Sequence, residues 1–281
     1  MLSSLIKSMR LRTLPLSLAG VVCGGLLAMG RSDGSWWTFA LVLLTGCLLQ
    51  ILTNLSNELG DHLSGVDGEG REGPNYSMAD GGLTVKQMWR AINGTVVACC
   101  LSGLAMVLVS VSPWWVLVLG AAAIWAATHY TLGKNPYGYI GLGDLFVFIF
   151  FGLVSVLGSY FVIAHAIEWH VLLPACGIGL LSVAVLNVNN IRDMASDEGI
   201  RHTIPLRIGE RCARWYQTAL IVGGTALMCI PDYHWWYSFA VGGIAVHLWM
   251  AWTCKGRRLD PALPILVLST FVFALLYGLQ L

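Results

Sequence analysis

Charged side chains are scarce in this sequence. Only 11% of the 281 residues are Asp, Glu, Lys or Arg, 57% are hydrophobic, and the mean hydropathy is +0.71. Because a soluble domain carries about 25% charged residues, this shortage excludes an ordinary water-soluble fold and indicates a chain that lies in a lipid bilayer. The formal net charge of +1 excludes a strongly basic nucleic-acid binder on overall charge, so we expect no nucleic-acid partner.

Patterns of metal-binding or disulfide-forming residues are also missing. The eight cysteines form no Cys-x-x-Cys pair and most lie in apolar runs, which is typical of small buried side chains. His62 and His202 are interpreted as structural or solvent-facing, and the other histidines show no pairing that indicates a metal site. No cleavable signal peptide is indicated either, because the apolar run from Leu14 is followed by a longer one from Trp36.

Long apolar runs are what the sequence does contain. Each lies near the roughly 17–25 residues with which a helix crosses the hydrocarbon core. The predicted spans are residues 14–30, 36–56, 95–111, 113–130, 142–165, 169–190, 215–231, 235–252 and 263–280. The sequence therefore predicts one all-α membrane domain over residues 1–281, with nine transmembrane helices.

The distribution of basic residues supports this topology. With nine spans the termini lie on opposite sides, and the N-terminal side then carries 15 of the 16 Lys and Arg residues, all except Arg31. Because cytoplasmic loops carry an excess of Lys and Arg, that side is predicted to be cytoplasmic. The two longest connections, residues 57–94 and 191–214, lie on the same side and are rich in Asp, Asn, Arg and Gly, so the functional site is expected there.

The first connection begins with oxygen-bearing side chains at helical spacing. If the second span continues as a helix, Asn57 and Asp61 share a face, and Asn54 joins them from one turn earlier. Glycines further along loosen the backbone, which lets Asp67 turn back toward the same point.

The second connection repeats this pattern, with Asn189, Asp193 and Asp197 spaced to form one stripe on a helix. Stacked carboxylates repel one another, and desolvation near a membrane adds a further cost, so a cation is expected to offset their charge. Oxygen-only ligands suit Mg²⁺, which is usually held by one or two carboxylates together with substrate phosphates. The predicted metal ligands, three for each of two Mg²⁺ ions, are Asn57, Asp61 and Asp67, and Asn189, Asp193 and Asp197.

Basic and aromatic residues accompany these segments. Arg71, Lys134, Arg192 and Arg201 are near in sequence or on the same face, and are predicted to contact phosphate oxygens. The four phenylalanines within residues 146–151 either contact lipid and pack, or face a cavity and stabilise a carbocation by cation–π attraction. The alternative that the two polar connections are only solvated cytoplasmic ends is disfavoured, because the same spacing occurs twice, each time at the end of a span.

Several strings of residues resemble the UbiA superfamily of intramembrane aromatic prenyltransferases, over nearly the whole chain. They are residues 10–15, 50–61, 138–146 and 189–197. Two features are similar to the branch of the superfamily that prenylates a naphthoate. They are the Gly-Leu-Gly-Asp string at residues 141–144 and the turn at residues 71–74. In the wider superfamily, Asp stands where this chain has Glu58 and Gly65, and the shift of the second Asp to Asp67 also resembles the naphthoate branch.

The resemblance implies nine helices around a central cavity with cytoplasmic Asp-rich loops, and a reaction. A polyprenyl diphosphate loses diphosphate, the allylic carbon attaches to 1,4-dihydroxy-2-naphthoate at its carboxyl-bearing position, and CO₂ is lost to give demethylmenaquinone. Mg²⁺ neutralises the leaving diphosphate, and the cavity keeps water from the allylic cation. The residues expected to carry catalysis are Asp61, Lys134, Arg192 and Asp193. Those expected to bind substrate are Asn54, Arg71, Lys134, Asp144, Arg192 and Arg201.

Two alternatives stay open at this point. A sister enzyme would use the same diphosphate site with another aromatic acceptor, such as 4-hydroxybenzoate or homogentisate. A cation-coupled secondary transporter would hold its carboxylates near the membrane midplane, whereas the acids here lie at one face. The expected location is the bacterial inner membrane, with a cytoplasmic N-terminus and an active site that opens to the cytoplasmic face.

Overall fold

The computed structural model describes residues 2–31, 34–65, 77–231 and 234–279, and all regular structure in these ranges is helical. The elements are α1 (Leu2–Ser8), η1 (Leu11–Thr13), α2 (Leu14–Arg31), α3 (Trp36–Ser64), α4 (Val85–Ser110), α5 (Trp115–His129), α6 (Gly143–Val147), the π-helical η2 (Phe148–Val154), α7 (Ser155–Ala164), α8 (Trp169–Arg192), α9 (Met194–Asp197), α10 (Ile204–Ile208), α11 (Glu210–Cys229), α12 (Tyr237–Thr253), η3 (Gly256–Leu259) and α13 (Ala262–Leu279).

The protein is a multi-pass membrane protein. Six helical segments are long and apolar enough to cross a bilayer: Leu2–Gly30, Trp36–Ser64, Val85–Ser110, Gly143–Ala164, Trp169–Arg192 and Gly256–Leu279. The remaining predicted spans fall on α5, which is apolar but shorter, and on α11 and α12. The all-helical membrane fold is thus confirmed, and the count of nine crossings stays a prediction.

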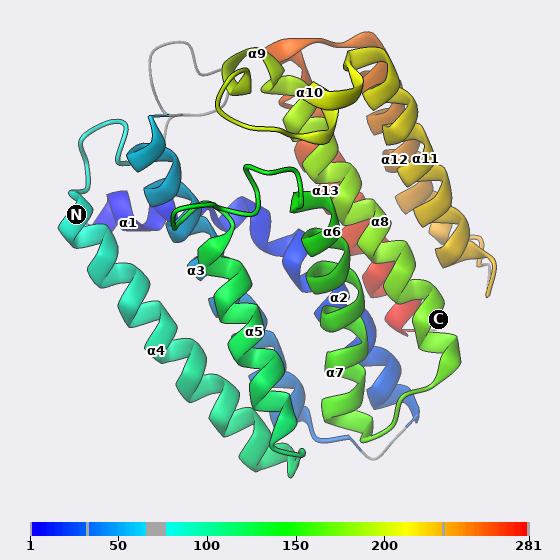
Figure 1. The fold of residues 1–281 in the computed structure, drawn as a ribbon. Helices are drawn as coiled ribbons and strands as arrows, with labels where there is room; N and C mark the ends of the chain where they lie inside the picture. Colours follow the sequence, from blue (N-terminus) through cyan, green and yellow to red (C-terminus); the bar gives the residue numbers. More distant parts are fainter. Residues whose placement is uncertain (1, 32–33, 66–76, 232–233, 280–281) are drawn as a thin grey trace.

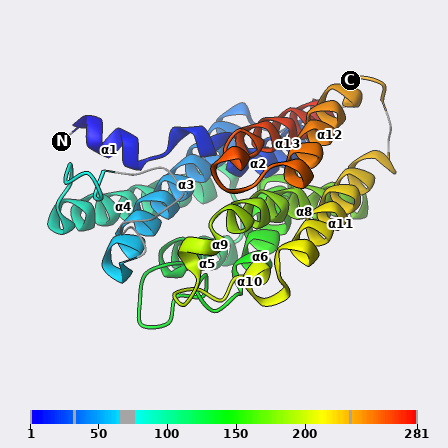
Figure 2. The same cartoon turned by 90° about the horizontal axis from the view of Figure 1, so that it is seen from above.

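The long helices run side by side. The first acidic segment, residues 57–61, and the second acidic segment, residues 189–197, lie at the same end of them. In Figure 1 the C-terminal ends of α3 and α8 both lie at the top, where α9, α10 and their connections also gather. Figure 2 shows α3, α2, α13 and α12 on one side of the molecule, and α5, α6, α8 and α11 on the other. α2 packs against α3, α7 and α13, while α8 packs against α11 and η2.

Local signals explain why two helices extend beyond the predicted spans. α4 begins at Val85, because Thr84 and Gln87 form a capping box that satisfies the first backbone N–H groups. α3 continues to Ser64 and ends where Gly65 adopts a left-handed conformation with φ 78°. The extension of α3 is what carries Asn57 and Asp61 onto one helix face.

Five exposed tryptophans lie at the end of the molecule opposite the acidic segments. Trp36 and Trp37 open α3, Trp114 precedes α5, Trp169 opens α8 and Trp235 precedes α12, and all five side chains are exposed. Trp is enriched where membrane proteins meet the headgroup layer. Their position at the end of the bundle that lies away from the acidic segments is typical of tryptophans at a membrane interface.

Candidate active site

A cavity of about 790 Å³ lies among α2, α3, α5, the α6–η2–α7 span, α8 and α13. Its polar lining includes Asn57, Asp61, Asn189, Asp193 and Arg201. Most of its remaining wall consists of aliphatic and aromatic side chains contributed by the same helices. Side chains from the two connections that the sequence singled out therefore meet at one cavity.

Asp61 holds the first acidic segment in place through partners that are distant in sequence. Its Oδ1 accepts a hydrogen bond from the Tyr139 hydroxyl at 3.0 Å and an ion-pair contact from Arg201 Nη2. The neighbouring Asn57 Oδ1 accepts a hydrogen bond from Thr131 Oγ1 at 3.3 Å. Thr131 approaches this closely because residue 60 is glycine: a Cβ there would lie 2.4 Å from Thr131 Oγ1.

Arg201 joins the first acidic segment to the second. Its Nη2 contacts Asp61, and its Nε lies 3.7 Å from Asp197 Oδ1. The guanidinium carbon lies 4.7 Å from the centre of the Tyr139 ring, above its face. Burial alone would lower the pKa of Arg201, but Asp61 and Asp197 outweigh that effect, so the pKa lies above its ordinary value. Burial, and then the charge of Asp61, raise the pKa of Tyr139, so its hydroxyl remains a donor.

The second acidic segment does not form the continuous helical stripe that its spacing predicted. α8 ends at Arg192, Asp193 has φ −91° and ψ 7°, and the short α9 follows. The spacing is nevertheless retained, because Asp193 N donates to Asn189 O at 3.1 Å and Asp197 N donates to Asp193 O at 2.9 Å. Asp193 lines the cavity, whereas Asp197 is buried and is not among the described residues that line it.

Arg192 neutralises Asp193 from the adjacent position. Its Nε and Nη2 each donate at 2.7 Å to one oxygen of the Asp193 carboxylate, and Nη2 also donates to Asn189 Oδ1 at 2.9 Å. The third nitrogen, Nη1, donates at 3.0 Å to Asp260, which lies just before α13. Sequence reasoning did not assign Asp260, although it stands in a short polar connection on the predicted cytoplasmic side.

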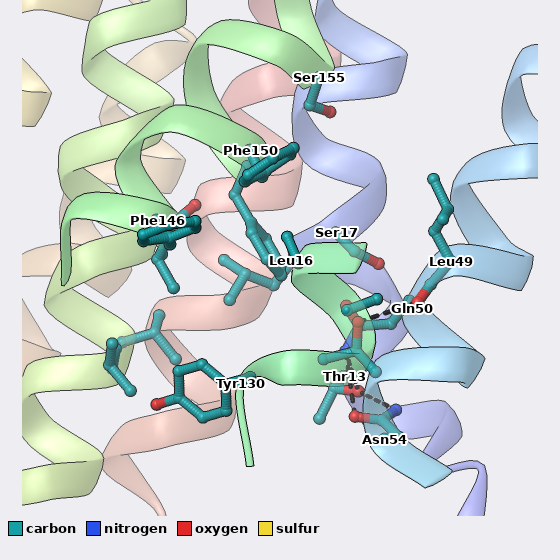
Figure 3. Close-up of a pocket in the computed structure, with 18 of the residues that line it drawn as sticks. Thr13, Leu16, Ser17, Leu49, Gln50, Asn54, Tyr130, Phe146, Phe150 and Ser155 are labelled. Carbon is teal, nitrogen blue, oxygen red and sulfur yellow. Dashed lines mark hydrogen bonds between the residues drawn. The ribbon is translucent and has the colours of Figure 1, made fainter. Parts of the chain in front are cut away.

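Asn54 lines the cavity and fastens the N-terminal segment to α3. Its Nδ2 donates to Met9 O at 2.8 Å and to Thr13 Oγ1 at 3.0 Å, while Gln50 Nε2 donates to Asn54 Oδ1 at 3.1 Å. Figure 3 shows these three polar side chains on one wall. Arg10 and Arg12 also line the cavity, and they were recognised in the sequence only as part of a family string.

The structure does not bring every predicted residue to this cavity. Lys134 is exposed in the connection between α5 and α6. Asp144 accepts a hydrogen bond from Tyr216 on α11 at 3.0 Å. Neither side chain is among the described residues that line the cavity. Glu58 is fully buried and accepts from Met78 N at 2.8 Å, so it stabilises the fold away from the cavity. Asp67 and Arg71 lie outside the residues that the structure describes.

An aromatic wall faces the polar one. The rings of Tyr137 and Phe146 stack with their centroids 4.0 Å apart. The rings of Phe146 and Phe150 also stack, with their centroids 6.1 Å apart. Figure 3 shows Phe146 and Phe150 across the cavity from Thr13 and Gln50. Phe148 instead packs against Gly179 of α8. Phe146 and Phe150 thus line the cavity, whereas Phe148 packs inside the bundle, in a span that contains a π-helical turn.

The oxygen ligands around the cavity suit a hard cation that is bound together with phosphate. In the part of the chain that the structure describes, no three His, Cys, Asp or Glu side chains gather into a metal-binding group. Each acidic segment instead offers carboxylate and amide oxygens, and Mg²⁺ uses such a sparse set when phosphate oxygens complete its coordination. Arg192 and Arg201 meanwhile balance the charge of these carboxylates. The residues fit a Mg²⁺–diphosphate group.

The chain belongs to the UbiA prenyltransferase family, whose model matches residues 17–277. It is accordingly a membrane prenyltransferase. It is 44% identical over 230 residues to the 1,4-dihydroxy-2-naphthoate octaprenyltransferase of Escherichia coli strain K12, a match that covers 80% of this chain and 74% of that protein. The protein of the same name from Haemophilus influenzae is 39% identical over 78% of this chain and 73% of its own length.

Solved structures share the fold. An apo UbiA homolog from Aeropyrum pernix K1 superposes with a TM-score of 0.71 at 15% identity, over 92% of this chain and 94% of that one. A UbiA homolog from Archaeoglobus fulgidus bound to GPP and Mg²⁺ gives a TM-score of 0.67 at 12% identity, over 99% and 100% of the two chains. At these identities the likeness establishes the fold alone.

Proposed function

We propose that the protein transfers a polyprenyl group from a polyprenyl diphosphate to 1,4-dihydroxy-2-naphthoate. The observation that carries this proposal is a single cavity that has both acidic segments at its polar wall and an apolar remainder suited to a prenyl chain. The names of the curated relatives that are 35–44% identical supply the acceptor. The bilayer is the source of the prenyl substrate, whose chain is as apolar as lipid.

The proposed reaction balances without an external base. The allylic C–O bond breaks, and its electron pair leaves with diphosphate. The carboxyl-bearing ring carbon forms the new C–C bond, and the bond to the carboxylate then breaks. Its electron pair returns to the ring and CO₂ departs, so no ring proton has to be removed. The product is the reduced form of demethylmenaquinone.

The chain's own residues would bind and orient the diphosphate. Mg²⁺ bound with it would neutralise the leaving charge. The carboxylates of Asp61 and Asp193 carry the proposed metal contacts, with the other ligands being Asn57, Asp67, Asn189 and Asp197. Arg192 and Arg201 already lie among these carboxylates and would turn toward phosphate oxygens. Lys134 and Arg71 remain candidates for phosphate contact, and Asp144 for orienting the substrate, on sequence grounds alone.

The aromatic and apolar walls would protect the allylic cation from water. The Phe146 and Phe150 rings line the cavity, and the negative face of such a ring attracts a nearby cation, with a strength of about 2 kcal/mol or more where water is excluded. The aliphatic side chains beyond them would accept the prenyl chain. This division of the cavity into a polar and an apolar part is what a substrate with a charged head and an apolar tail requires.

The same reasoning gives the proposed topology. We place nine spans in a bacterial inner membrane, with the N-terminus and the mouth of the active site on the cytoplasmic side. The predicted clustering of Lys and Arg on that side supports the orientation. The exposed tryptophans at the other end support an interface there.

The test is incubation of membranes that contain the protein with 1,4-dihydroxy-2-naphthoate, polyprenyl diphosphates and Mg²⁺, followed by mass analysis of the lipid. We expect prenylated, decarboxylated naphthoquinol, and none when EDTA replaces Mg²⁺. If product forms with 4-hydroxybenzoate or homogentisate but not with the naphthoate, the acceptor is that other compound and the proposed acceptor is wrong. Metal-dependent solute uptake by vesicles without any prenylated product would instead favour a transporter.

A further inference from the structure

Asp260 lies at the cavity, outside both acidic segments. It follows η3 and directly precedes the α13 region, and it is one of the residues that line the cavity. Its Oδ1 lies 3.0 Å from Arg192 Nη1, across 68 positions of sequence. The Arg192 side chain is only 5% exposed, whereas that of Asp260 is 45% exposed. A buried guanidinium is thus tied to a carboxylate that is open to the cavity.

Arg192 is shared between two carboxylates. The nitrogens Nε and Nη2 face Asp193 as a bidentate pair, and the remaining nitrogen, Nη1, faces Asp260. Such a fork is the strongest geometry for an Arg–carboxylate contact. Because a guanidinium has five N–H groups in a fixed plane, Asp193 and Asp260 take different edges and do not compete for the same protons.

We propose that Asp260 is a positioning residue for the diphosphate site, which retains Arg192 at the cavity when Asp193 binds the cation–diphosphate group. This inference rests on the proposed function. A cation at Asp193 competes with the two contacts that Arg192 makes there. Arg192 then keeps one counter-charge, Asp260, and its released N–H groups become available to phosphate oxygens.

The physical reason is the cost of a buried charge without a partner. Removing one member of a buried ion pair is strongly unfavourable, because the remaining charge has lost its water and gained nothing in return. Without Asp260, Arg192 would resist leaving Asp193, so the cation would have to displace the only carboxylate that the guanidinium has. Asp260 makes the exchange of partners possible while Arg192 stays buried.

A purely structural role for Asp260, as a tie between α8 and the segment before α13, makes different predictions. Such a tie would lower stability when broken but would leave diphosphate affinity unchanged. A positioning role acts through Arg192, so its effect on affinity disappears once Arg192 has been removed. Binding of inorganic diphosphate separates the two roles, since it requires neither the prenyl chain nor the acceptor.

The experiment uses the full chain in lipid nanodiscs. Binding of inorganic diphosphate with Mg²⁺ is measured by calorimetry, and KM and kcat are measured with the prenyl substrate. We expect Asp260→Ala to raise both the diphosphate Kd and the KM for polyprenyl diphosphate about tenfold, the scale of one charge-assisted hydrogen bond, with the KM for the acceptor unchanged. Asp260→Glu should restore most of the loss, and Asp260→Asn should fall between.

Two comparisons decide the outcome. In an Arg192→Ala background, Asp260→Ala should change the diphosphate Kd by less than about twofold. Asp80→Ala is the matched control, because Asp80 also pairs with a basic side chain, Lys7, but is exposed and does not line the cavity. An unchanged Kd in Asp260→Ala, or a full additional loss in the Arg192→Ala background, overturns the inference.

Failure of this inference is distinguishable from failure of the proposed function. If the wild type binds Mg²⁺–diphosphate but forms no prenylated naphthoate, the proposed acceptor is wrong, and the diphosphate Kd of Asp260→Ala still decides the role of Asp260. If the wild type forms the product and Asp260→Ala binds diphosphate normally, only the role of Asp260 fails. Should Asp260→Ala unfold, the Asn and Glu variants carry the same comparison, because they keep the side chain's shape or its charge.

Discussion

The two acidic segments are similar in sequence spacing but are held in place differently. The first lies on an unbroken helix, α3, and its Asp61 is held by Tyr139 and Arg201 from other parts of the chain. The second lies where α8 breaks, and its Asp193 is held by its own neighbour Arg192. The spacing of ligands is therefore not enough to define such a site. The first segment depends on distant contacts, whereas the second is largely assembled locally.

The largest expected effect comes from removing the central carboxylate of each segment. Asp61→Ala and Asp193→Ala should each lower prenyl transfer by roughly 10²-fold or more, because each removes charge that holds the leaving group's cation. The measurement is product formation in membranes at saturating Mg²⁺. Full activity in either variant would remove that residue from the proposed metal site.

Loss of Arg201 should break the connection between the segments. Its contact with Asp61 is buried, with side chains 12% and 7% exposed, and breaking such a pair costs about 3–5 kcal/mol. Arg201→Ala should lower the unfolding temperature clearly. The control is Lys7→Ala, which breaks a pair whose side chains are 47% and 49% exposed, with a cost of about 0–1 kcal/mol. Equal stability of the two variants would contradict the account.

A methyl group at position 60 should disturb the first segment selectively. Gly60→Ala places a Cβ against Thr131, and overpacking of this kind costs about 1–3 kcal/mol. Gly94→Ala is the matched control on α4, because its added Cβ meets nothing within 4 Å beyond the adjoining helix backbone, and greater helix propensity should make it neutral or slightly stabilising. Thermal unfolding of both variants checks this, and the contrast fails if they behave alike.

The smallest expected effect comes from a single hydroxyl. Tyr139→Phe removes the hydrogen bonds to Asp61 and Ser64 but keeps the ring beneath Arg201. One hydrogen bond of this kind contributes about 1 kcal/mol, so transfer should fall several-fold at most. The KM for polyprenyl diphosphate should account for most of the change. A loss as large as that of Asp61→Ala would mean that Tyr139 acts on the substrate directly.

Much of this arrangement could be predicted from the sequence, because it depends on local patterns. Apolar run lengths indicated an all-helical membrane protein, and the spacing of Asn57 and Asp61 indicated a shared helix face once α3 continued. The membership of the UbiA family, suggested by the same strings, is confirmed by the family match. These features need only hydrophobicity and helical periodicity, which a single sequence displays.

The remainder depends on contacts that sequence spacing does not encode. The break at Asp193 is a backbone detail that the periodicity of the segment conceals. Asp260 reaches Arg192 only because η3 and α8 meet in the fold. Asp144 was expected to orient the substrate; the structure pairs it with Tyr216 on α11, and it is not among the described residues that line the cavity. Such partnerships need the tertiary structure.

The central claim is that both acidic segments hold one cation–diphosphate group together. The most direct measurement is a titration with Mn²⁺, a paramagnetic substitute for Mg²⁺, followed by electron paramagnetic resonance in the presence of inorganic diphosphate. The account predicts two diphosphate-dependent Mn²⁺ ions per wild-type chain, and fewer in both Asp61→Ala and Asp193→Ala. Two tightly bound ions in either variant would contradict it.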